Sequence, residues 1–173
     1  MTIEPRKGLK FKAEATAAIA RLMLTSAYRE PLREPSCVRT DPPGLVTRVF
    51  HFTGKGRDVN VSVTAHAKVM VGLLKALRKT PSIQVAGSLA SYRSWDTQYR
   101  LWFNWIHKIE GSHLAAHPCY GFHRCGRSLD LYNVTAEERV TMLSVRVKAG
   151  AKYIGFYDLL PQDPPHFTLS ERG

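Results

Sequence analysis

The 173-residue chain is poor in cysteine, in acidic residues and in long apolar runs, and each shortage excludes a class of protein. Its three cysteines, Cys37, Cys119 and Cys125, are odd in number and irregularly spaced. This argues against a disulfide-stapled secreted domain and for synthesis in a reducing compartment. No apolar run is long enough to cross a bilayer, and charges recur through Glu14, so neither a membrane span nor a signal peptide is expected.

The shortage of acidic residues leaves a strong positive charge. The sequence has 14 Asp and Glu against 25 Lys and Arg, a formal net charge of +11. Such an excess favours polyanionic partners: nucleic acid, anionic lipid or an acidic bacterial cell wall. The basic residues are scattered rather than gathered into a recognisable nucleic-acid-binding motif. General attraction to an acidic polymer is therefore expected, without specific binding of nucleic acid.

The hydrophobic pattern predicts one mixed α+β domain, a small antiparallel sheet flanked by helices, with an N-terminal helical extension. With 44% hydrophobic residues and no internal repeat, the chain suits one domain with a real core. Residues 1–60 read as the extension and a proline-rich linker, which can also belong to the same domain, and residues 61–173 as the main domain. The predicted helices cover residues 10–29, 65–80, 94–111 and 136–150, and the predicted strands lie within 45–64 (a hairpin turning at 53–56), 82–91, 127–133, 151–160 and 166–169.

The segment "YGFHRCGRSLDLYN", residues 120–133, raises the possibility of a metal site. Gly126 permits a tight bend between His123 and Asp130, so that both side chains can converge. Asp130 alternates with two leucines, and a carboxylate beside a core strand needs a partner such as a cation. His166, stiffened by two preceding prolines, is the third candidate ligand. A His, Asp, His set suits zinc with a fourth position left for water.

A metal-bound water must lose a proton before it can attack a carbonyl, and a nearby carboxylate commonly accepts it. Asp163 stands three residues before His166 and is the first candidate for this base, with Asp158 and Glu171 in reserve. Arg93, with Gln98 five positions on, is available to stabilise an oxyanion or to hold a substrate carboxylate.

The segments "SLASYRSWDTQYRLWFNW", "EGSHLAAHPCYGFHRCGRSLDLYN" and "DPPHF" together resemble the zinc peptidases that include D-alanyl-D-alanine carboxypeptidases and phage endolysin peptidases. The family pattern runs S-G-Y-R-S with a downstream Gln, then S-x-H-x-x-G-x-A-x-D, then E-x-W-H. The match covers about residues 88–169, and the spacing inside the central motif is complete. The departures are Gly121 in place of serine, Ser128 in place of alanine, Asp163 in place of glutamate and Pro165 in place of tryptophan.

The resemblance implies a D,D-peptidase-like fold in which the two histidines and Asp130 bind zinc. It implies that Arg93 steadies the substrate or oxyanion, that Tyr92 and Gln98 contact the substrate, and that Asp163 is the base. Family substrates are peptidoglycan stem peptides, cut at a D-Ala terminus or between L-Ala and D-Glu. A phage-type endolysin, made in the host cytoplasm and acting at the cell wall, is the expected protein. Related peptidases end in a "GxGFY" strand leading to H-x-D, and that version would keep His166 without a base at position 163.

Several alternatives stay open at this point. A structural zinc site could use the crowded histidines and cysteines of residues 113–125, and either Cys119 or Cys125 could be a nucleophile, although small packing residues are expected there. The aromatic segment "YRLWFNWIH" invites a nucleic-acid reading, but Leu101, Trp102, Trp105 and Ile106 have the helical spacing of core residues. A catalytically silent wall-binding or virion structural domain, or a basic nucleic-acid-binding protein, are the alternative functions.

Overall fold

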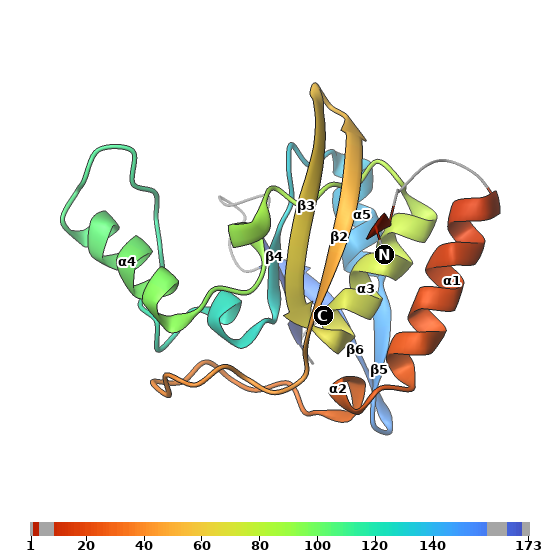
Figure 1. The fold of residues 1–173 in the computed structure, drawn as a ribbon, viewed down its shortest axis with the longest axis horizontal. Coiled ribbons are helices and arrows are strands. Elements are labelled where there is room, and N and C mark those ends of the chain that lie inside the picture. Colours follow the sequence, from red (N-terminus) through yellow and green to blue (C-terminus); the bar gives the residue numbers. More distant parts are fainter. Residues whose placement is uncertain (1, 4–8, 159–165, 171–173) are drawn as a thin grey trace.

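The computed structural model describes residues 2–3, 9–158 and 166–170. It is an α+β protein with two small sheets (Figure 1). The first sheet has the order β1-β2-β3, in which β1 is parallel to β2 and β2–β3 is an antiparallel hairpin. The second has the order β4-β7-β6-β5 and is antiparallel throughout. No helix in the described part of the chain is long and apolar enough to span a membrane.

Helices and strands both occur throughout the described residues. The helices are α1 (Leu9–Met23), α2 (Ser26–Arg29), α3 (Ala67–Lys79), α4 (Trp95–Ile106) and α5 (Ala136–Ser144), with short 3-10 turns η1 (Ser88–Ala90) and η2 (Phe122–Cys125). The strands are β1 (Thr2–Ile3), β2 (Leu45–Gly54), β3 (Arg57–His66), β4 (Ser128–Asp130), β5 (Arg146–Ala149), β6 (Lys152–Asp158) and β7 (His166–Ser170).

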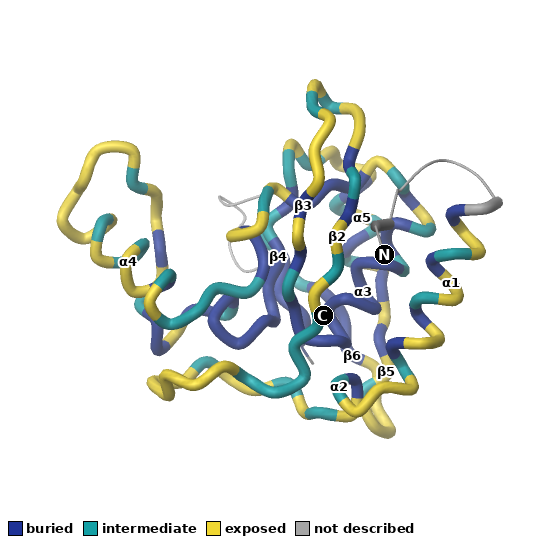
Figure 2. The backbone as a smooth tube through the Cα atoms, viewed as in Figure 1, coloured by how far each residue is buried: buried dark blue, intermediate teal, exposed yellow. Residues whose placement is uncertain are grey.

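Helix α3 is the centre of the core. Nearly all of its residues from Ala67 to Leu77 are buried, which is why it appears dark in Figure 2. A methyl group at Gly72 would lie 2.6 Å from the ring of Phe156 on β6, so the glycine lets this helix approach the four-stranded sheet closely. On another side α3 packs against α1, where Arg78 donates a hydrogen bond to Thr16. A helix covered on several sides is necessarily apolar around most of its circumference.

The N-terminal third is part of the same core. Four apolar residues of α1, spaced by three or four positions, are buried in the cluster that also contains α3 and both sheets: Phe11, Ala15, Ile19 and Leu22. The boundary expected after residue 60 falls inside β3, which pairs with β2 over ten residues on each side. Residues 1–60 therefore supply helices α1 and α2, strands β1 and β2, and the first part of β3 to the domain.

Two of the predicted elements are wrong. Residues 82–91 form no strand: Val85 makes a single bridge to Leu131, and the guanidinium of Arg57 takes up the carbonyls of Val85 and Ala86. The helix predicted over residues 136–150 ends at Ser144, and residues 146–149 form β5 instead. Alternation decides this segment, because buried Val145 and Val147 face the core while their neighbours are exposed.

The segment from residue 94 to residue 121, here called the arm, stands away from the rest of the described chain, here called the body. Figure 1 shows α4 on the arm, separated from both sheets. The prediction that Leu101, Trp102, Trp105 and Ile106 are core residues is therefore wrong. Trp105 and Ile106 keep 40% and 42% of their surface exposed, and the other two are half-buried. Helical spacing shows which face is apolar, but only a neighbouring element can bury it.

The number and spacing of the cysteines argued against a disulfide framework, yet Cys37 and Cys119 form a disulfide. The bond joins the proline-rich loop before β2 to the end of the arm, 82 residues apart in sequence. The loop is itself held to the body by Arg124, whose guanidinium donates to the carbonyls of Val38, Arg39 and Thr40. Spacing could not reveal this pair, since the two cysteines meet only through the fold. Cys125 is free and buried.

Candidate metal centre

The three predicted ligands come from three elements at one end of the four-stranded sheet. Asp130 ends β4 and is the register partner of His166, which begins β7, so the two residues lie directly across from each other. His123 lies on η2, and the chain then turns at Gly126, whose φ is +69°. A methyl group there would lie 2.6 Å from Leu45 and 3.0 Å from the backbone nitrogen of His66. The glycine is thus required both by its left-handed backbone and by close packing.

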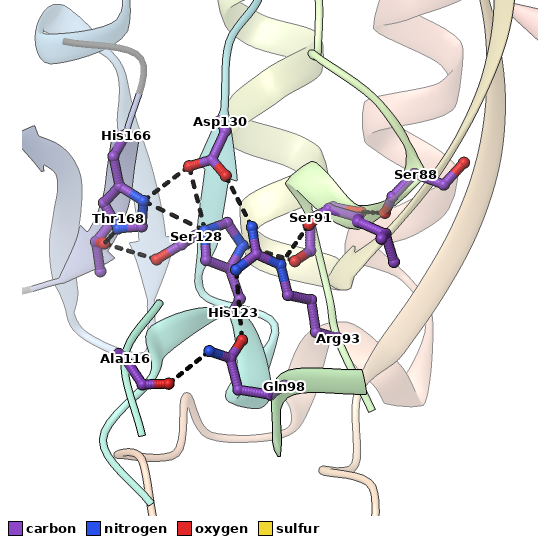
Figure 3. A network of polar contacts seen from close by, with 11 residues as sticks. Ser88, Ser91, Arg93, Gln98, Ala116, His123, Ser128, Asp130, His166 and Thr168 are labelled. Carbon is purple, nitrogen blue, oxygen red and sulfur yellow. Dashed lines mark hydrogen bonds and ion pairs between the residues drawn. The ribbon is translucent and has the colours of Figure 1, made fainter. Parts of the chain in front are cut away.

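The ligand atoms converge as the sequence predicts (Figure 3). His123 Nε2 lies 3.2 Å from Asp130 Oδ1 and 3.2 Å from His166 Nδ1, and the last two atoms are 2.8 Å apart. Ligand atoms of a tetrahedral zinc site are about 3.3 Å apart, given zinc–ligand bonds of about 2.0–2.1 Å. Within residues 2–3, 9–158 and 166–170 this is the one group of three or more histidine, cysteine or acidic side chains close enough to hold an ion.

Hydrogen bonds on the far side of each imidazole prepare the converging nitrogens to bind a cation. His123 Nδ1 lies 2.7 Å from the carbonyl oxygen of Ser91, which can only accept, so this nitrogen carries the proton and Nε2 presents a lone pair. His166 Nε2 lies 3.2 Å from Thr168 Oγ1, and a proton donated there leaves a lone pair on Nδ1. Two lone pairs and a carboxylate then face one point, an arrangement that a cation stabilises.

Electrostatics keeps the group in its metal-binding form. Burial lowers the pKa of His123, although Asp130 acts in the opposite direction, so the imidazole readily gives up a proton to an arriving cation. Burial acts to raise the pKa of Asp130, but charge and hydrogen bonds from the two histidines outweigh it and hold that pKa below its usual range, so the carboxylate stays ionised. A neutral imidazole and an ionised carboxylate are the forms that bind metals.

Arg93, predicted from the sequence to act at the site, lies beside the three candidate ligands. Its Nη2 donates to Asp130 Oδ2 at 3.0 Å, so that Oδ1 faces the histidines while Oδ2 is held by the guanidinium. Its Nη1 lies 3.4 Å from Gln98 Oε1. Gln98 is buried and donates from Nε2 to the carbonyl of Ala116 at 2.6 Å, which ties α4 to the returning, irregular segment of the arm.

A cavity of about 570 Å³ opens over the group. The body contributes Arg93 and the three ligands to its lining, and the arm contributes its far wall, notably His113, Leu114 and Tyr120. Tyr92, expected to contact substrate, is outside this lining: its hydroxyl donates to Asp41 and accepts from Arg124. Arg93 and Gln98 do line it, and their roles toward a substrate stay predictions.

The predicted base, Asp163, and the reserve candidate Glu171 lie outside the described residues. The other reserve, Asp158 on β6, forms an ion pair with Arg139 of α5 and is not part of the converging group.

The alternative zinc site in residues 113–125 loses Cys119 to the disulfide. Burial raises the pKa of the Cys125 thiol to about 11, which argues against a nucleophilic thiolate there.

The residues that orient the ligands were not found from the sequence. Ser91 contributes only a backbone carbonyl, which no sequence pattern signals. Thr168 is buried and shares a 2.7 Å hydrogen bond with Ser128 on the neighbouring strand. Its position two residues after His166, on the same face of β7, was the available signal, because side chains alternate along a strand.

Comparisons of the chain with family models, with curated proteins and with solved structures find no match. The resemblance to zinc peptidases therefore rests on the motifs themselves and stays a prediction.

Proposed function

We propose that the protein is a zinc-dependent peptidase that hydrolyses stem-peptide bonds of peptidoglycan, as a phage-type endolysin would. The observation that carries the proposal is the convergence of His123, Asp130 and His166 in one cavity with Arg93. Two imidazole nitrogens and one carboxylate oxygen are a donor set that suits zinc and leaves a coordination position open. Bound zinc would supply Lewis acidity and lower the pKa of a coordinated water.

Other groups of the site would orient the ligands, stabilise negative charge and transfer a proton. The Ser91 carbonyl and the Thr168 hydroxyl hold the imidazoles in the tautomers that a metal requires. Arg93 fixes the second oxygen of Asp130 and, lining the cavity, would hold a substrate carboxylate or the negative charge that develops on the scissile carbonyl. Asp163, three residues before His166 in the sequence, would accept the proton of the attacking water and pass it to the leaving amine.

The charge of the chain fits the same substrate. A net charge of +11 would raise the concentration of the protein at an acidic cell wall. We propose that the enzyme is made in the host cytoplasm and acts on the wall once it has access to it.

The test is release of new amino groups from purified peptidoglycan, with the metal content measured in the same samples. Chelation should abolish release and zinc should restore it. His123→Ala should lose bound zinc and lower the rate by more than about a hundredfold, the upper end of what removing an outer-shell partner costs. His51→Ala is the matched control, because His51 pairs with Asn60 and Asp58 on the β2–β3 hairpin.

Absence of zinc binding and of hydrolysis would favour one of the alternative functions. A purified protein that binds no zinc and releases no amino groups under these conditions is a silent wall-binding or virion domain. Tight, salt-sensitive DNA binding without wall hydrolysis would instead favour a nucleic-acid-binding protein. Mass spectrometry of products from a defined muropeptide would show which bond is cut.

A further inference from the structure

The rings of the arm form a continuous series of contacts. Along one face of α4, the ring of Tyr99 lies 6.2 Å from that of Phe103, which lies 4.2 Å from that of His107. On its other side Tyr99 lies 5.7 Å from Trp102. These spacings are typical of interacting aromatic pairs. The rings thus pack on one another where no sheet or helix of the body covers them.

The series crosses from α4 to the returning segment and reaches the cavity. Trp102 lies 4.6 Å from the His117 ring, and His117 lies 5.8 Å from the ring of Tyr120. Tyr120 is 74% exposed and lines the cavity that contains the metal-binding group. We name this series the ring track, and it consists of His107, Phe103, Tyr99, Trp102, His117 and Tyr120.

The track remains accessible to a ligand. Tyr99 is 45% exposed and Phe103 is 40% exposed, so a ligand could cover the outer part of the track as well as its cavity end. Large apolar side chains exposed together are a recognised sign of a binding surface. Tyrosine, tryptophan and histidine also carry polar edges, which suits a ligand with both apolar faces and hydroxyl or amide groups.

Charge separates the arm from the rest of the chain. The arm has two basic residues, Arg100 and Lys108, and two acidic ones, Asp96 and Glu110, so the formal charge of +11 lies entirely outside it. A polyanion would be drawn to the body rather than to the track. An uncharged ligand is the electrostatic match for a neutral surface.

We propose that the ring track binds the glycan strand of peptidoglycan, stacking the apolar faces of its N-acetylated sugars and leading the attached peptide into the cavity. The sugar backbone of the glycan is extended, and it carries no charge wherever the lactyl carboxyl group is joined to a stem peptide by an amide bond. It therefore matches both the shape and the charge of the track. The inference rests on the proposed function, and it adds that the preferred substrate is a stem peptide still attached to sugar, cut close to the glycan.

The experiment uses tryptophan fluorescence of the full chain titrated with a soluble oligomer of N-acetylglucosamine, an uncharged stand-in for the glycan, because removing the peptides from wall glycan would free a lactyl carboxylate on every muramic acid. All three tryptophans lie on α4, so the signal reports the arm alone. Saturable binding is expected in the unaltered protein. Tyr99→Ala and Tyr120→Ala should each weaken it about tenfold, the effect of removing one well-placed ring. Tyr99→Leu, which keeps an apolar helix face, repeats the test should the alanine variant unfold.

Two controls separate this proposal from the peptidase proposal. Tyr153→Ala removes a tyrosine from β6 on the body whose exposure, 66%, lies between those of Tyr99 and Tyr120, and it should leave glycan binding unchanged. His123→Ala should bind glycan as well as the unaltered protein does, because the track contains no metal ligand. Glycan binding without hydrolysis would contradict the proposed peptidase activity but would support the proposal that the ring track binds glycan.

Substrate kinetics sharpen the result. With a sugar-linked muropeptide, Tyr99→Ala should raise KM with little change in kcat, whereas hydrolysis of the free stem peptide should be unaffected. The proposal is overturned by absence of glycan binding, or by equal losses in the Tyr99 and Tyr153 variants. Track-dependent binding of a 12-nucleotide oligothymidylate or of phosphatidylglycerol vesicles, without glycan binding, also overturns it.

Discussion

The body and the arm of this protein differ in how far they bury their apolar side chains. In the body, α3 and both sheets bury phenylalanine, leucine and valine residues almost completely. In the arm, the aromatic residues of α4 pack on one another and stay partly exposed. Figure 2 shows α4 mostly in the colours of exposed and intermediate residues. The body also carries the whole net charge, whereas the arm is neutral. The difference supports the proposal that the arm contacts a ligand outside the chain, whereas the body supplies the buried core and positions the three metal-binding side chains.

The comparison predicts that a core substitution in the body lowers stability far more than one on the arm, and this is the largest effect expected. Leu73→Ala on α3 should lower the free energy of unfolding by about 2–5 kcal/mol, because Leu73 is fully buried and its removal leaves a cavity. Ile106→Ala on α4 should change it by no more than about 0.5 kcal/mol, since Ile106 is 42% exposed. Denaturant unfolding followed by far-UV circular dichroism measures both. Equal losses would show that the arm is an integral part of the core.

The disulfide between Cys37 and Cys119 cross-links the two regions in addition to the backbone. Replacing Cys37 and Cys119 by serine should lower the free energy of unfolding by about 2–4 kcal/mol, because the bond closes a long loop in the unfolded chain. Hydrogen exchange should rise first in residues 107–121, which the bond fastens to the proline-rich loop. A phosphine reductant applied to the unaltered protein should reproduce both effects. An unchanged exchange rate in the arm would mean that noncovalent contacts suffice to hold it.

Acid should weaken the body through His66, which is 1% exposed and caps α3 by accepting a hydrogen bond from Lys68. Burial, followed by the charge of Lys68, lowers the pKa of His66 to about 4. Because the unfolded chain takes up the proton near pH 6.5, this contribution to stability is complete above that pH and is lost as the pH falls toward 4. The loss should reach about 2–3 kcal/mol at pH 4.5.

The variant His66→Asn tests the assignment, since asparagine also caps a helix but does not titrate. Its free energy of unfolding should fall less steeply than that of the unaltered protein between pH 6.5 and pH 4.5. Parallel curves would assign the acid sensitivity to other groups.

The smallest effect concerns how the body alone positions the metal ligands. Thr168→Val keeps the shape of a buried side chain but removes the oxygen facing His166 Nε2, and should weaken zinc binding by about tenfold to a hundredfold. Tyr99→Ala, on the arm, should leave zinc affinity unchanged. Competition with a chromogenic chelator measures both. A loss of zinc affinity in the Tyr99 variant would show that the arm helps to form the metal site.

His123 and Asp130 were predictable because their clues are local, whereas His166 joined the set through the order of the motifs along the chain. A glycine between His123 and Asp130, and alternation around Asp130, are properties of short segments, and the structure brings both residues to His166 as expected. The hairpin of β2 and β3 was predictable for the same reason. The disulfide, the Ser91 carbonyl and the exposure of α4 were not, because each depends on which distant segments become neighbours.

The sequence by itself determined the periodicities that set most helices and strands, the bend at Gly126, and the set of side chains able to bind a metal. Only the tertiary structure decided that the apolar face of α4 would have no element of the body against it, and that Cys119 would meet Cys37. The physical reason is that propensity and hydrogen bonding act over a few residues, whereas burial is fixed by the packing of segments far apart in the chain.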